Sequence, residues 1–219
     1  MSLHLQRAME HLRSQLLSLC TLVEEQSEGA VRALMERDPQ LAEVVEKRDA
    51  AVDQCEVAIE EECLKTLALY QPVAIDLRFV VAVLKMNNDL ERIGDLAVNI
   101  ARKAAAFAQL PPMPIPFDLP GMWAKTRSML RDSIQSLVNH DAVLAHSVCL
   151  RDDDVDRLKR QIRKKAAEMM ANHPTHTSAL LTLMAVSRNL ERIADHATNV
   201  AEDVLYMVQG RIVRHETTD

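Results

Sequence analysis

Carboxylate pairs recur along this 219-residue chain at a spacing that suits metal binding. The members of each pair are four positions apart, so on a helix their side chains lie one above the other, about 5–6 Å apart at the β-carbons. The four pairs are Asp49 with Asp53, Glu91 with Asp95, Asp152 with Asp156, and Glu191 with Asp195. Carboxylate oxygens suit hard cations such as Mg²⁺, Mn²⁺ and Ca²⁺ and can bridge iron ions. We therefore take these eight residues as candidate metal ligands.

The same pairs also fit a plain acidic surface. Like charges at this spacing destabilise a helix by a few tenths of a kcal/mol, so some favourable interaction should offset them. Neighbouring arginines could do this on an ordinary solvated helix face. They stand at Arg48, Arg92, Arg151 and Arg192. The spacing by itself leaves both interpretations open.

Motifs of other chemistries are missing from the sequence. The four glycines are isolated, so there is no Gly-rich phosphate loop. None of the eight histidines follows a Glu by three positions, as a ferritin-type di-iron site requires. His196 adjoins Asp195 and is either an accessory ligand or a surface histidine. A helical metalloenzyme is one rival to a non-enzymatic metal protein, although it would need open coordination positions and a base of tuned pKa. A metal-free helical scaffold, whose acidic faces only bind basic surfaces of partners, is the other.

The elements that carry these residues are predicted to be helices. Glycine is scarce and aromatic residues make up only 3%, whereas strong helix formers such as Ala, Leu, Glu and Arg dominate. Prolines mark the ends of the helical segments, and five of the eight lie within residues 111–120. The predicted helices lie near residues 2–37, 40–70, 75–108, 118–140, 142–171 and 176–209. Gly210 is the predicted C-cap of the last one.

An internal repeat organises these helices. The segment "DLERIGDLAVNIA" begins at Asp89, and the similar "NLERIADHATNVA" begins at Asn189. The preceding helices also match, for example Asp38 with Asp141. In both copies an apolar stripe with helical period leaves the carboxylates on the opposite side of the helix. We therefore predict an all-α protein of two tandem three-helix bundles: residues 1–110, a Pro-rich connector at 111–120, and residues 121–219.

Charge and cysteine content limit the binding partners and the cellular compartment that the sequence favours. The net charge of −6 does not favour nucleic-acid binding, and the basic run within residues 157–165 is interpreted as a solvated helix face. The four cysteines form no C-x-x-C pair, which favours a reducing compartment. The first residues, "MSLHLQRAMEHLRSQLLSLC", lack the apolar core of a signal peptide. We expect a cytoplasmic protein.

Several segments resemble the PhoU family of phosphate-signalling adaptors. They are "QPVAIDLR" from Gln71, "LERIGDLAVNIA" from Leu90, "LERIADHATNVAED" from Leu190 and "GRIVRH" from Gly210. In the second copy "HPTHTSAL" stands where the first has "QPVAIDLR", so a role of that segment, including Arg78, is expected in the first copy only.

The resemblance implies a particular fold, a set of metal sites and a set of protein partners. It implies two three-helix bundles in a pseudo-two-fold arrangement, with multinuclear metal sites at the paired carboxylates holding iron, zinc, manganese or magnesium. It implies a regulator and not an enzyme, linking the ATPase subunit of a phosphate transporter to a sensor histidine kinase and repressing the starvation response when phosphate is plentiful. A homodimer that reaches the membrane only through its partners is also expected.

Overall fold

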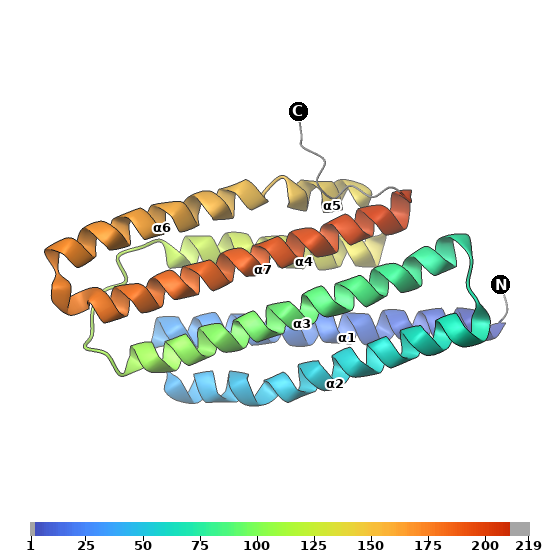
Figure 1. Cartoon of the computed structure of the whole chain (residues 1–219), viewed down its shortest axis with the longest axis horizontal. Helices are drawn as coiled ribbons and strands as arrows, with labels where there is room; N and C mark the ends of the chain where they lie inside the picture. The colour runs from blue at the N-terminus through green and yellow to red at the C-terminus, as the bar shows by residue number, and fades with distance from the viewer. Residues whose placement is uncertain (1–2, 211–219) are drawn as a thin grey trace.

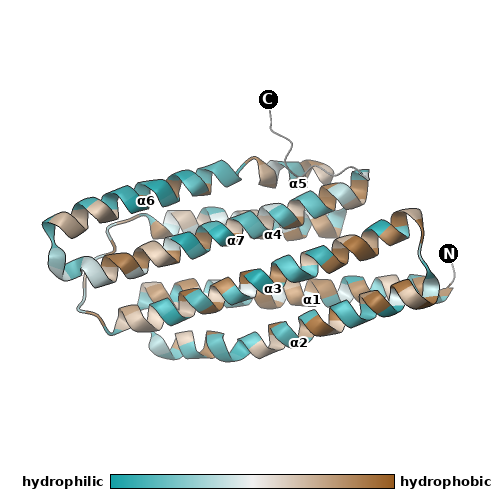
Figure 2. Ribbon diagram, viewed as in Figure 1, coloured by the Kyte–Doolittle hydropathy of each residue, from teal (hydrophilic) through white to brown (hydrophobic). Residues whose placement is uncertain are grey.

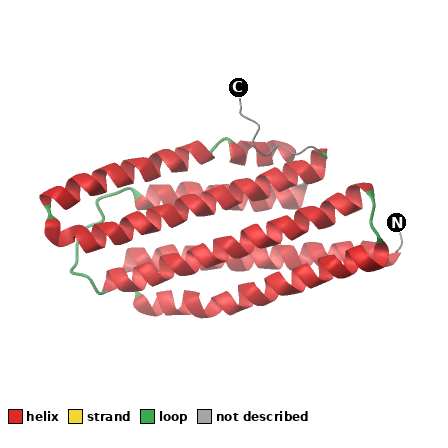
Figure 3. Ribbon diagram, viewed as in Figure 1, coloured by secondary structure: helices red, strands yellow, loops and turns green. Residues whose placement is uncertain are grey.

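The computed structural model describes residues 3–210, and these form an all-helical molecule (Figures 1 and 3). The α-helices are α1 (Leu3–Glu36), α2 (Pro39–Tyr70), α3 (Ala74–Ala108), α4 (Leu119–Asn139), α5 (Ala142–Cys149), α6 (Asp152–Asn172) and α7 (Thr177–Gln209), with a 3-10 helix η1 (Pro174–His176) before α7. The predicted all-α class is confirmed. Residues 211–215 of the closing "GRIVRH" motif lie outside the described residues.

The helices form two bundles that pack against each other. Helices α1, α2 and α3 make the first bundle, and α4 to α7 make the second. Figure 1 shows α2 and α6 at opposite edges of the molecule, with α1, α3, α4 and α7 between them. Helices α3 and α7 run antiparallel, because Lys85 lies 3.3 Å from Asp203 whereas Asp89 lies 2.8 Å from His196. This arrangement confirms the predicted duplication.

The predicted apolar stripes form the core. On α3, Leu90, Ile93 and Ala97 are fully buried, and their counterparts on α7 are buried to the same degree. Burial of a large apolar side chain stabilises the fold by about 1.5–3 kcal/mol, so these stripes hold the central helices together. The outer helix α6 is largely hydrophilic, as Figure 2 shows. None of the helices within residues 3–210 is apolar over a length that would span a bilayer.

Matching caps begin the second helix of each copy. The Asp38 carboxylate accepts hydrogen bonds from the backbone N–H groups of Gln40 and Leu41, at 2.9 and 3.0 Å. Asp141 caps α5 in the same way. These bonds satisfy donors that have no partner within the helix. At the other end of the chain, Gly210 has φ 73° and its N–H donates to the Tyr206 carbonyl at 2.8 Å, which confirms the predicted C-cap.

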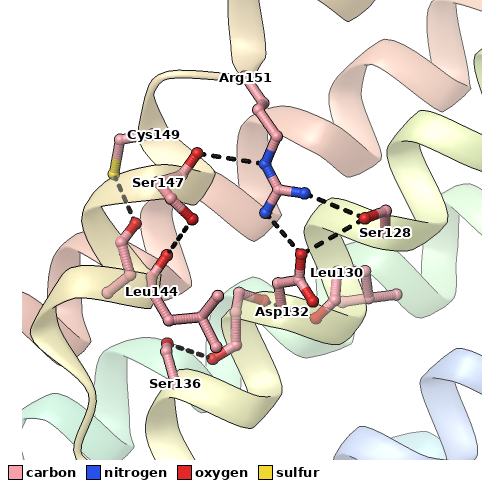
Figure 4. A network of polar contacts seen from close by, with 10 residues as sticks. Ser128, Leu130, Asp132, Ser136, Leu144, Ser147, Cys149 and Arg151 are labelled. Atoms are coloured by element: carbon pink, nitrogen blue, oxygen red, sulfur yellow. Dashed lines mark hydrogen bonds and ion pairs between the residues drawn. The ribbon is translucent and has the colours of Figure 1, made fainter.

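The prediction of a single helix over residues 142–171 is wrong, because the helix is interrupted between α5 and α6. Figure 4 shows the Arg151 guanidinium turned back from the break onto α4, where it lies 2.7 Å from Asp132 and donates to the Ser128 hydroxyl at 3.0 Å. Helix α6 then begins with three consecutive aspartates, Asp152 to Asp154. Negative charge is favoured at a helix N-terminus, so these residues stabilise a new start here.

The connector between the copies lies two residues earlier than predicted, at residues 109–118, because α3 ends at Ala108. Helix α4 begins at Leu119, so Leu119 and Pro120 belong to its first turn and not to the connector. Proline suits this position because the first turn of a helix has no use for its missing N–H. Asp118 caps the helix by accepting a hydrogen bond from the Gly121 N–H at 2.9 Å.

Candidate metal centres

The carboxylates of the first copy come together between α2 and α3. Asp49 and Asp53 on α2 face Glu91 and Asp95 on α3, and we call these four residues the first carboxylate cluster. Burial raises the pKa of Asp49, and the charges of Asp53 and Asp95 raise it further. Burial and then Asp95 raise the pKa of Glu91, to which Asp53 also contributes. The carboxylates of α2 and α3 therefore act on one another's charges.

Helix α1 adds a polar group that the sequence analysis missed. The Gln26 side chain, which is 1% exposed, donates from Nε2 to the Asp49 carboxylate at 3.0 Å. Its Oε1 atom is buried without a hydrogen-bond partner in the described structure. Gly94 permits this approach, since a β-carbon at residue 94 would lie only 3.2 Å from Oε1. An unpaired amide oxygen beside carboxylates extends a donor set that suits a hard cation.

The second copy repeats the arrangement between α6 and α7. We call Asp152, Asp156, Glu191 and Asp195 the second carboxylate cluster. Burial, followed by the charges of Glu191, Asp152 and Asp156, raises the pKa of Asp195 to about 6. Burial and then Asp156 raise the pKa of Asp152. Carboxylates that crowd together in this way lower their mutual repulsion by binding a proton or a cation.

Cations of the protein itself already lie in both clusters. Lys159 Nζ lies 2.8 Å from Asp156 and also bonds Glu191, and its hydrogen bond lowers the pKa of Asp156. In the first cluster, the Arg92 guanidinium lies 3.1 Å from Asp95 and 3.5 Å from Glu91. A metal ion would have to compete with these ion pairs for its ligands.

The donor chemistry fits a metal ion, whereas the side-chain positions are not those of a closed coordination shell. Within residues 3–210, no three His, Cys, Asp or Glu side chains converge closely enough to hold an ion. The crowded carboxylates and the unpaired Gln26 oxygen nevertheless provide oxygen donors only, as magnesium, manganese and bridged iron require. Metal binding at the eight carboxylates therefore stays a prediction.

The raised pKa of Asp195 predicts how the metal-free protein responds to pH. The folded state holds a proton on Asp195 up to about pH 6, whereas the ordinary value is 3.8, so stability is lost as the pH rises between these values. After chelator treatment, Asp195→Asn is therefore expected to be more stable than wild type at about pH 7.5. Solvent screening of this surface carboxyl reduces the gain to about 1 kcal/mol.

The measurement is urea unfolding of both proteins across this pH range in the presence of chelator. The gain should disappear near pH 4, where Asp195 of the folded wild type is itself neutral. Glu168→Gln, on the exposed face of α6, reports the effect of removing one surface charge. If the gain in the free energy of unfolding is absent at pH 7.5, or is as large at pH 4 as at pH 7.5, then burial and neighbouring carboxylates do not raise the pKa of Asp195.

His196 belongs to neither interpretation that the sequence suggested. Its Nδ1 atom lies 2.8 Å from the Asp89 carboxylate of α3, and Asn199 Nδ2 donates to the same oxygen at 3.0 Å. Asp89 is buried, and it accepts both contacts across the interface between the two copies. His196 therefore points away from the second carboxylate cluster and joins the two bundles.

The fold and these clusters define a class: a duplicated helical protein in which each copy carries paired carboxylates on its outer side. The PhoU domain family model matches residues 16–104 and 119–204. The chain belongs to the PhoU family.

Relatives and solved structures agree over nearly the whole chain. A phosphate-specific transport system accessory protein PhoU homolog of Pseudomonas putida is 39% identical over 208 residues, which cover 94% of this chain and 81% of the relative. The corresponding homolog of Aquifex aeolicus is 37% identical, with 96% and 95% covered.

The crystal structure of PhoU from Pseudomonas aeruginosa superposes with a TM-score of 0.90 at 36% identity, covering 94% of this chain and 99% of that one. The phosphate transport system regulatory protein PhoU from Streptococcus pneumoniae gives 0.88 at 30% identity, with 95% and 99% covered. The family thus consists of accessory and regulatory proteins of phosphate transport, which is not a class of enzyme.

Proposed function

We propose that this chain restrains phosphate-starvation signalling and phosphate uptake by linking the ATPase subunit of a phosphate transporter to a sensor histidine kinase. The observation that carries the proposal is family membership, because relatives that match 94% or more of the chain are named accessory proteins of the phosphate-specific transport system. Long, mostly polar outer helices such as α6 offer surfaces on which such partners could dock.

Metal ions bound at the two carboxylate clusters are the second part of the proposal. The crowding of four carboxylates in each copy supports it, since burial and then the charge of neighbouring carboxylates raise the pKa of Asp49, Glu91, Asp152 and Asp195. A bound iron, zinc, manganese or magnesium ion would supply the positive charge that these groups lack. Asp49, Asp53, Glu91 and Asp95 would hold it in the first copy, and Asp152, Asp156, Glu191 and Asp195 in the second.

The proposed setting is the cytoplasm, with the membrane reached only through the transporter. The four free cysteines support this, because cytosolic proteins keep their thiols reduced. We further propose that the protein acts as a homodimer and does not bind nucleic acid, in keeping with its net charge of −6.

The test of the proposal is a phosphate-responsive reporter in a strain that lacks this protein. We expect the reporter to be high at all phosphate concentrations, because the kinase is no longer restrained. A plasmid copy of the wild-type chain should restore repression at high phosphate. Normal regulation in the deletion strain would contradict the proposed role, and pull-down of the transporter ATPase and the kinase with the tagged protein would identify the link directly.

A further inference from the structure

A groove of about 540 Å³ lies between α6 and α7 beside the second carboxylate cluster. Met184 and Ser187 of α7 contribute to its lining, and Glu191 and Asp195 belong to it as well. Five cationic side chains surround these residues. They are Lys159, Arg160, Arg163, Arg188 and Arg192. The lining therefore carries more positive than negative side chains, although the whole chain is acidic.

Three of these cations have no acidic partner. Lys159 and Arg160 pair with Asp156, at 2.8 and 3.8 Å. Arg163, Arg188 and Arg192 are exposed, and within residues 3–210 none of them forms an ion pair or a side-chain hydrogen bond. Their guanidinium groups are thus available to an anion from outside the protein.

The first copy serves as an internal comparison. At the positions of Lys159, Arg160 and Arg163 it carries Glu56, Val57 and Glu60. At the positions of Arg188 and Arg192 it carries Asn88 and Arg92. The same three-helix unit therefore folds with only one of these five cations, so the other four are not a requirement of the bundle. The basic run on α6 is also more than the solvated face expected from sequence, because α7 adds two arginines beside it.

We propose that this groove binds a small ligand that carries two or more linked phosphate groups, such as a nucleoside triphosphate or a short inorganic polyphosphate. Arginine forms paired, charge-assisted hydrogen bonds with phosphate oxygens, and three unpaired arginines match several phosphate groups better than a single one. The groove volume lies within the range of small-molecule sites. The site is specific to the second copy and goes beyond the proposed adaptor role.

Titration calorimetry with ATP and with tripolyphosphate, both in the presence of EDTA, tests the proposal. The wild-type chain should bind at least one of them, and Arg163→Ala/Arg188→Ala/Arg192→Ala should weaken binding by about 100-fold. The matched control Arg7→Ala/Arg32→Ala/Lys103→Ala removes the same charge from other exposed sites and should bind like wild type. Replacing the three groove arginines by Lys should restore only part of the affinity, because lysine lacks the paired geometry.

Four outcomes would overturn the proposal. Wild type could fail to bind either polyanion at millimolar concentration, or both triple variants could lose affinity equally. Wild type could bind vesicles of anionic phospholipid but neither soluble compound, which would make a lipid headgroup the ligand. Sedimentation at low salt could instead show that the arginines pair with the acidic α2 of a second copy. Thermal unfolding of each variant confirms that loss of binding does not reflect loss of fold.

Discussion

Replacement of Asp95 and Asp195 together by asparagine is expected to lower bound metal to less than about one tenth of the wild-type stoichiometry at the same free-metal concentration. Each change removes one charged ligand from a carboxylate cluster, and loss of even a supporting group around a metal typically costs 10–100-fold in affinity. Helical circular dichroism should be unchanged, because both side chains lie outside the buried core. Elemental analysis after dialysis against buffered metal provides the measurement.

The control for this experiment is a variant with Glu36→Gln and Glu168→Gln, which removes the same charge from exposed positions outside both clusters. It should retain the wild-type metal content. The two single variants show how the metal is shared, since Asp95→Asn affects only the first cluster and Asp195→Asn only the second. Unchanged stoichiometry in the double variant would remove both aspartates from the set of candidate ligands.

Arg37→Ala is expected to lower the free energy of unfolding by about 3 kcal/mol. Arg37 lies between α1 and α2, and its guanidinium donates to the carbonyls of Phe107, at 2.7 Å, and Leu110. It also lies 4.4 Å from the centre of the Phe107 ring. Phe107 lies in the last turn of α3 and Leu110 just beyond its end, so the arginine adds hydrogen bonds there and neutralises the negative end of the helix dipole.

Glycine at the same position distinguishes the stability lost with the side-chain contacts from the cost of the backbone conformation. Arg37 has φ 54°, a conformation that costs a non-glycine residue roughly 1 kcal/mol or more. Arg37→Gly should therefore be about 1 kcal/mol more stable than Arg37→Ala. Urea unfolding gives both values, and Arg32→Ala, at an exposed site on α1, should stay within about 0.5 kcal/mol of wild type. A similar result for Arg37→Ala would mean that the contacts to α3 add nothing to stability.

Features that depend on neighbours along the chain were predictable from sequence. Helical period and proline positions act over one or two turns, so they locate most helix ends to within a residue or two. The repeat also predicted the tertiary arrangement, because two copies of one unit must bury equivalent apolar stripes. It also predicted the carboxylates of α2 and α3 on a shared side, in keeping with the effect of the Asp95 charge on the pKa of Asp49.

The contacts that the polar and charged side chains make with other helices depend on tertiary packing alone. Lys159 enters the second cluster, Gln26 reaches the first from α1, and His196 turns to Asp89 on the other copy. The interruption between α5 and α6 likewise involves contacts of Arg151 with Ser128 and Asp132 of α4, which are distant in sequence. The hydrophobic periodicity of a helix predicts which of its faces is polar, but it does not predict which other helix packs against that face. Pairing and burial of the charged groups, and hence their pKa shifts, therefore arise only from the tertiary structure.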